Sequence, residues 1–173
     1  MRTFYAGLIE VMKQASALGF DGRYKKLEPL VDAAYDLPLM SRITVGPQWN
    51  TLTPEQQDKF KQSFRRYTIA TYASRFEGFS GERFEVSPKT EPSQGSDIIV
   101  ATKLITKDGD PIELNYLMRN AGAGWRIIDV FLSGTISELA TRRSEFSSVL
   151  RRDGIDGLVN LLNDHIKEME SPH

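Results

Sequence analysis

Residues 124–146 constrain the fold more than any other segment of the chain. The run GWRIIDVFLSG at 124–134 is rich in aromatic and β-branched residues and ends in a glycine turn, as a β-strand does. The next four residues, TISE at 135–138, match a helix-capping box, and apolar residues at helical spacing follow them. A sheet must therefore pack against a helix here. The segment holds large apolar groups and no obvious nucleophile or metal ligand, which favours holding an apolar molecule over transforming one.

Composition excludes several classes of protein. The chain has 173 residues, enough for one domain with a sizeable core, and its 22 basic and 23 acidic residues leave a net charge of -1. That balance argues against a nucleic-acid binder, which would normally be basic. Because there is no cysteine, disulfides and thiolate metal sites are excluded. No apolar run approaches the roughly 20 residues that a membrane-spanning helix needs, and the first residues lead into a helical pattern, so we expect no signal peptide within the chain.

The spacing of apolar residues predicts helices through the first half of the chain. One is expected at about 4–15, with a stop at Gly19, and a shorter one at about 27–34, with Pro29 near its start.

Two more helices carry clear start signals. Asp36 is a candidate cap for a short helix that closes at Gly46, and the TPEQ box at 53–56 begins a long one that runs to about Phe76. The long helix is unusually aromatic. By default its aromatic stripe is core packing, but a core that did not close completely would leave an apolar cavity for a hydrocarbon guest.

From Glu82 the apolar period changes to two. Phe84 and Val86 form a short strand before a polar loop at 88–95, and further strands are expected at 98–104, 112–118 and 125–132. The sequence KDGD at 107–110 predicts a hairpin turn. After this four-stranded antiparallel meander come a helix opened by residues 135–138 and a last helix capped by Asp153. The order predicts a single α+β domain over residues 1–173.

Asp129 is the one carboxylate that strand alternation aims at the interior. It shares parity with Trp125, Ile127 and Phe131. It could act as a general base in a cone-shaped α+β pocket of the ketosteroid-isomerase type. The alternative, which we favour, is a structural ion pair or a position at the rim of the sheet.

Arg143 is the expected partner of Asp129. Helical spacing places Arg143 between Leu139 and Phe146 on the apolar stripe and directs Arg142 to water. The guanidinium of Arg143 would either hold a lipid head group at a pocket mouth, or extend along the apolar surface to water or pair with Asp129 to anchor the helix on the sheet, and we favour this second, structural role.

Motifs of known catalytic sites are absent from the sequence. It contains no glycine-rich phosphate loop, no G-x-S-x-G elbow and no H-E-x-x-H. His165 has no acid or nucleophile at a motif spacing, so we interpret it as a surface or groove histidine. We therefore expect no enzyme activity, no cofactor and no metal.

Several segments resemble the MlaC or toluene-tolerance family of periplasmic lipid-binding proteins. They are YAGLI at 5–9, LTPEQ at 52–56, GWRIIDV at 124–130, RSEFSSVL at 143–150 and GIDGL at 154–158. More narrowly, YASRF at 72–76 and LATRRSEF at 139–146 are similar to the HpnM branch, named for its association with hopanoid biosynthesis.

The resemblance implies a periplasmic carrier with a mixed helix-and-sheet fold and a deep apolar pocket. Members carry phospholipid between membrane-bound complexes, including an inner-membrane ABC transporter, and the HpnM branch implies a hopanoid as a possible cargo. We expect bound lipid in place of a cofactor, transient docking to membrane complexes, a monomer, and a signal sequence trimmed from this chain.

Strand parity and helix spacing predict which side chains contact the lipid. They are Phe64, Tyr67, Tyr72, Phe84, Val100, Leu114, Tyr116, Ile127, Leu139, Arg143 and Phe146. Tryptophan in place of Leu114 or Val100 should evict lipid. Two alternatives stay open: a small-molecule enzyme that uses Asp129, and a protein-interaction module with a filled core and an exposed apolar groove.

Overall fold

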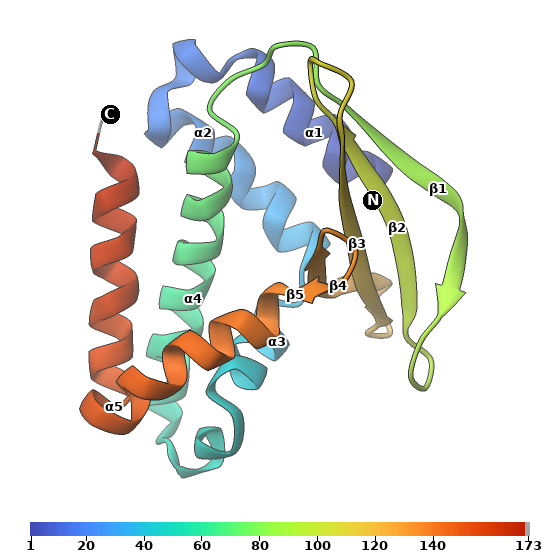
Figure 1. The fold of residues 1–173 in the computed structure, drawn as a ribbon. Coiled ribbons are helices and arrows are strands. Elements are labelled where there is room, and N and C mark those ends of the chain that lie inside the picture. The colour runs from blue at the N-terminus through green and yellow to red at the C-terminus, as the bar shows by residue number, and fades with distance from the viewer. Residues whose placement is uncertain (172–173) are drawn as a thin grey trace.

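A curved antiparallel sheet packs against a layer of helices in the computed structural model, which describes residues 1–171 (Figure 1). In these residues the helices are α1 (Arg2–Lys13), α2 (Ala15–Ala34), α3 (Leu37–Val45), the 3-10 helix η1 (Gly46–Thr51), α4 (Pro54–Arg75) and α5 (Glu138–Glu170). The strands are β1 (Arg83–Pro92), β2 (Ile98–Ile105), β3 (Pro111–Asn120), β4 (Trp125–Leu132) and β5 (Ile136–Ser137). None of the helices in this part of the chain has both the length and the hydropathy needed to cross a membrane.

The sheet is a five-stranded meander in the order β1-β2-β3-β4-β5. The mixed helix-and-antiparallel-sheet class is as predicted, but the short fifth strand is not. Residues 88–92, expected in a loop, belong to β1, where the pairing with β2 shifts register between Val86 and Thr90. The two prolines of this segment are tolerated because β1 is an edge strand.

A bulge in β4 changes which side chains face the helices. Tyr116 of β3 pairs with Val130, whereas Met118 pairs with Ile127, so one extra residue of β4 is accommodated between them. Ile127 and Val130 therefore share the helix-facing side. The predicted alternation of Ile127, Asp129 and Phe131 on one face is wrong for this reason.

The first helices differ from their predicted lengths. The helix expected at 27–34 begins much earlier, and Gly19 is a break inside α2, with φ 60° and ψ -174°, between two helical stretches. Pro29 lies within the helix, where the fully buried Leu27 and Val31 hold the segment against the core. Tertiary packing here outweighs the cost of proline in a helix.

The next two helices begin as predicted. The Asp36 carboxylate accepts a hydrogen bond from the Leu39 amide, and Thr53 and Gln56 form the complete capping box of α4. α4 ends at Arg75, one residue before the expected end.

The C-terminal helix starts later than predicted and bends at a glycine. Ser137, rather than Thr135, caps α5, because Ile136 and Ser137 pair with β4 as β5. Gly154 breaks α5 with φ 67° and ψ -168°, a backbone region that is essentially restricted to glycine. The predicted cap Asp153 instead pairs with Arg152. The half before Gly154 crosses from the sheet past α3, and the half after it lies along α4 (Figure 1).

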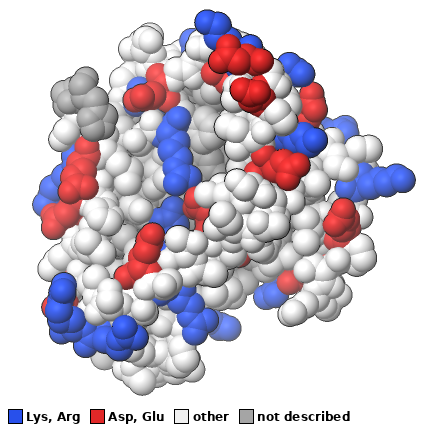
Figure 2. All heavy atoms as spheres, in the orientation of Figure 1, with Lys and Arg blue, Asp and Glu red and all other residues white. Residues whose placement is uncertain are grey.

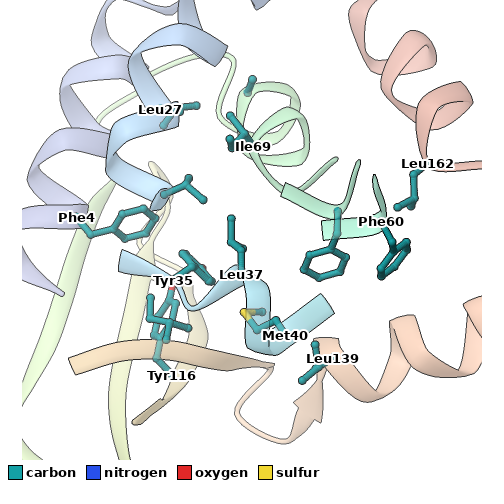
Figure 3. Packing of buried hydrophobic residues seen from close by; sticks show 14 of the residues in the cluster. Phe4, Leu27, Tyr35, Leu37, Met40, Phe60, Ile69, Tyr116, Leu139 and Leu162 are labelled. Atoms are coloured by element: carbon teal, nitrogen blue, oxygen red, sulfur yellow. The ribbon is translucent and has the colours of Figure 1, made fainter. Parts of the chain in front are cut away.

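The core fills the space between the helices and one face of the sheet. Figure 3 shows Phe4, Tyr35 and Tyr116 where the helices meet the sheet, with Met40 and Leu139 between α3 and the start of α5. The helix-to-helix part of the same cluster contains Leu27, Phe60, Ile69 and Leu162, which like Phe64 are fully buried. This continuous packing positions α3, α4 and the start of α5 against β3 and β4.

Candidate functional site

A small apolar cavity lies where α3, α4 and the start of α5 meet β3 and β4. Its volume is about 80 Å³. Its apolar and aromatic walls are Tyr35, Met40, Phe64, Tyr72, Phe76, Leu114, Tyr116, Val130, Leu132 and Leu139, and its polar lining is Thr68, Thr71, Arg75, Glu138 and Arg142. Larger hollows elsewhere are more open and have more polar linings, so this cavity is the best candidate for an apolar ligand.

Two tyrosines give the cavity an uncharged aromatic wall. The Tyr35 and Tyr72 hydroxyls hydrogen-bond to each other, and the Phe4 ring packs edge-on against both, at 5.9 and 5.6 Å between centroids. Phe76 stacks on Tyr72 with 5.6 Å between ring centroids. Burial raises the pKa of both tyrosine hydroxyls. The wall therefore stays neutral at physiological pH, and its paired hydroxyls do not require a polar ligand.

Tyr5 of α1 fastens the sheet behind this wall. Its hydroxyl lies 2.6 Å from Thr102 Oγ1, which in turn donates to the Leu114 carbonyl at 2.5 Å. The Tyr5 ring stacks on Phe84 with 3.9 Å between centroids and an interplanar angle of 9°. Burial raises the pKa of Tyr5 to about 12, so this hydroxyl also remains protonated.

Charged side chains stand at the edge of the cavity. Glu138, in the first turn of α5, accepts from Arg75 Nη1 at 3.1 Å with one carboxylate oxygen and from Arg142 Nη2 at 3.2 Å with the other. The Arg142 guanidinium carbon also lies 4.8 Å from the centroid of the Tyr67 ring. Figure 2 shows Lys, Arg, Asp and Glu side chains around a hollow on this face of the molecule.

The structure places five of the eleven side chains predicted from sequence at the cavity wall. These are Phe64, Tyr72, Leu114, Tyr116 and Leu139. They come from α4, β3 and α5, so the tertiary structure brings together residues up to 75 positions apart, from 64 to 139. That they contact lipid stays a prediction.

The other six lie outside the cavity lining. Val100, Ile127 and Phe146 are buried in the surrounding core. Phe84 stacks on the far side of Tyr5, and Tyr67 lies under Arg142 with its ring 6.0 Å from His165.

Arg143 is placed differently from the prediction. Its guanidinium lies against Gly46, where an added Cβ would come within 3.0 Å of Nη2. Of the two neighbouring arginines, Arg143 is exposed, whereas the Arg142 side chain is only 13% exposed. Positions 142 and 143 lie to either side of the line through Leu139 and Phe146 on the helix, so spacing alone does not choose between them, and packing against Tyr67 of α4 places Arg142 on the buried side.

Asp129 is not a cavity residue, and it does not pair with Arg143. Its carboxylate accepts hydrogen bonds from the Val130 amide at 2.7 Å, the Ser137 hydroxyl at 2.5 Å and the Leu139 amide at 3.1 Å. It thus ties the bulge in β4 to the first turn of α5. These hydrogen bonds and the position at a helix N-terminus explain why a carboxylate is buried here, and they give Asp129 a structural role.

Several lining residues were missed by the sequence reasoning. On α4 the spacing of Phe64, Thr68, Thr71, Tyr72, Arg75 and Phe76 follows one helical face, so this signal was available. Val130 and Leu132 were hidden by the bulge, whereas Tyr35 and Met40 join the wall only through tertiary packing. Among residues 1–171 there is no cluster of three His, Asp or Glu that could hold a metal ion.

Comparison with known proteins gives a family and a fold. A family model described as "MlaC protein" matches residues 2–164. The toluene tolerance protein Ttg2D of Pseudomonas putida is 27% identical over 138 residues, which cover 79% of this chain but only 61% of that protein, less than two thirds of its length. A phospholipid-binding protein from Ralstonia solanacearum, solved in complex with a phospholipid, has a TM-score of 0.84 at 21% identity, with 98% of this chain and 96% of that one covered.

Proposed function

This chain belongs to the MlaC family, and from that premise we propose that it is a lipid carrier that holds the hydrocarbon of a phospholipid or hopanoid in the cavity between sheet and helices. The observation that carries the proposal is the partly enclosed apolar cavity with charged groups at its edge. The similar fold that was solved with a phospholipid supports it.

A carrier must bind hydrocarbon strongly but reversibly. Each buried CH₂ contributes about 0.8 kcal/mol, so one long acyl chain represents roughly 10 kcal/mol relative to water. The membrane offers nearly the same stabilisation. The cavity therefore needs only to stabilise hydrocarbon about as well as the bilayer does. An apolar wall whose neutral tyrosines bond to each other meets this need and makes no polar bond to the ligand.

The cavity must expand to receive such cargo. Its volume of about 80 Å³ is well below the roughly 300 Å³ at which ligand pockets begin. The first half of α5 supplies Glu138, Leu139 and Arg142 to the lining and lies between Gly134 and Gly154, both at positive φ. We propose that this half-helix separates from the sheet when lipid enters.

The finer assignments follow from the family resemblance. We propose that the protein acts in the periplasm as a monomer, docks transiently to membrane complexes that include an ABC transporter, and belongs to the HpnM branch. It carries out no chemical reaction, a proposal consistent with the structural role of Asp129.

Native mass spectrometry of the purified protein, followed by organic extraction, tests the carrier proposal. We expect phospholipid or hopanoid in a fixed ratio to protein, or uptake of lipid on incubation with vesicles. A protein that stays lipid-free after that incubation would contradict the proposal and favour the filled-core interaction module.

A further inference from the structure

We propose that Arg75 and Arg142 form a binding site for the anionic phosphate or carboxylate of a lipid head group, with Glu138 occupying that site when no head group is present. This inference rests on the proposed lipid-carrier function and narrows the cargo to lipids with an acidic head.

The geometry around Glu138 resembles that of a bound oxyanion. One arginine binds each oxygen of its carboxylate, at 3.1 Å for Arg75 and 3.2 Å for Arg142. Two non-bridging oxygens of a phosphate, or the two oxygens of a fatty acid, can accept from the same pair of guanidinium groups. The side-chain carboxylate thus shows that the two arginines can converge on a single acidic group.

The net charge of the Arg75, Glu138 and Arg142 cluster favours binding of an anion. Two guanidinium groups share one carboxylate, so the three side chains carry a net charge of +1. Arg142 is 13% exposed and Glu138 19% exposed, whereas Arg75 is 56% exposed. The cluster therefore extends from the partly desolvated cavity edge to water, which is the path that a head group must occupy while its tail is buried.

Stability alone gives little reason for this arrangement. An ion pair that is largely removed from water contributes little net stability, because desolvation offsets the attraction. The face of the Tyr67 ring supplies Arg142 with a second favourable contact that does not depend on Glu138. Arg142 accordingly keeps a favourable contact when the Glu138 side chain rotates away from it.

The two proposed kinds of cargo differ in whether they can bind this arginine pair. A phospholipid or a fatty acid can replace the Glu138 carboxylate, whereas an uncharged polycyclic hydrocarbon cannot. The acidic lipid gains the two arginine contacts in addition to hydrocarbon burial, and it should be retained in preference to a neutral lipid with the same chains.

Competition between two lipids tests the site. The protein is incubated with mixed vesicles of phosphatidylglycerol and diacylglycerol that have identical acyl chains, and the ratio of the two bound lipids is measured after re-isolation and extraction. We expect the wild type to favour phosphatidylglycerol. In Arg75→Met and in Arg142→Met the ratio of bound phosphatidylglycerol to bound diacylglycerol should fall about tenfold, because each variant loses a hydrogen bond to the charged head group. A parallel incubation with oleic acid shows whether a carboxylate is accepted as well as a phosphate.

Two further variants separate a binding role from a structural one. Glu138→Gln removes the competing charge and should raise the ratio, whereas a purely structural ion pair predicts that it lowers the load of both lipids together. Arg65→Met is the matched control, because Arg65 also lies on α4 and binds two carboxylates, Glu28 and Asp32, but lies outside the cavity lining. Its ratio should equal that of the wild type.

The outcomes distinguish the two proposals. A wild type that takes up neither lipid overturns the carrier function itself. Uptake of both lipids in their vesicle proportion, unchanged in Arg75→Met and Arg142→Met, overturns the head-group site and leaves the carrier function intact.

Discussion

Replacing Leu114 by tryptophan should fill the cavity from the sheet side and exclude lipid. Leu114 lines the cavity from β3, where its carbonyl is held by Thr102 and its pairing partner on β4 is Leu132. An indole at this position extends into the open volume between the sheet and the helices. We expect Leu114→Trp to have opposite effects on stability and on lipid binding.

The magnitude follows from the cavity volume. At about 24 cal/mol per Å³, a cavity of about 80 Å³ costs the lipid-free protein up to about 2 kcal/mol. A tryptophan that occupies half of it should raise the free energy of unfolding by about 1 kcal/mol, or the melting temperature by about 2–4 °C for a chain of this size. Urea unfolding of delipidated protein measures the first effect, and native mass spectrometry after incubation with vesicles measures the loss of lipid.

Ile112→Trp is the matched control for this experiment. Ile112 lies two residues before Leu114 on the same face of β3 but is 44% exposed and outside the cavity lining. It should bind lipid like the wild type, with stability changed by no more than about 0.5 kcal/mol. A folded Leu114→Trp protein that carries the wild-type lipid load would refute the reasoning, because the cavity would then not be the lipid site.

Three other perturbations test the packing around the site. Gly154→Ala should lower the free energy of unfolding in denaturant by about 1–3 kcal/mol, because the backbone at Gly154 is strained for other residues. Steric crowding does not contribute, since an added Cβ meets nothing within 4 Å. Gly78 is equally open but lacks a positive φ, so Gly78→Ala is the control and should change stability by under about 0.5 kcal/mol. Asp129→Ala should lower the free energy of unfolding by about 3 kcal/mol, because it leaves the Ser137 hydroxyl and two backbone amides without their acceptor. The lipid load per folded molecule should stay unchanged. Loss of lipid from folded Asp129→Ala would count against a purely structural role. Because burial raises the pKa of Tyr5 from 10.0 to about 12, its stabilising contribution is complete below about pH 10 and is lost as the pH rises towards 12, on the order of 3 kcal/mol in all. Unfolding free energies at increasing alkaline pH should show this decline in the wild type and a shallower one in Tyr5→Phe.

Local signals in the sequence located most of the elements. The caps at Asp36 and Thr53 and the hairpin turn at 107–110 depend on hydrogen bonds between near neighbours, and each is present in the structure. The glycine breaks at Gly19 and Gly154 also lie where the sequence indicates a helix boundary. These features were predictable because the residues that specify them lie within a few positions of each other.

The candidate site was only partly predictable for a related reason. Phe64, Tyr72 and Leu139 follow from helix periodicity, and Leu114 and Tyr116 from an uninterrupted strand. Beyond the β4 bulge the strict alternation fails, so Val130 and Leu132 take the places that parity assigned to their neighbours.

By itself, then, the sequence determined the class of fold, the boundaries set by caps and turns, and which faces of α4 and β3 are apolar. Only the tertiary structure decided that those faces enclose a cavity, that Asp129 holds the first turn of α5, and that Arg142 rather than Arg143 reaches its edge. The physical reason is that periodicity records which side of an element is buried. Whether the space between buried sides is full, and which of two adjacent arginines faces it, depends on how elements distant in sequence pack together.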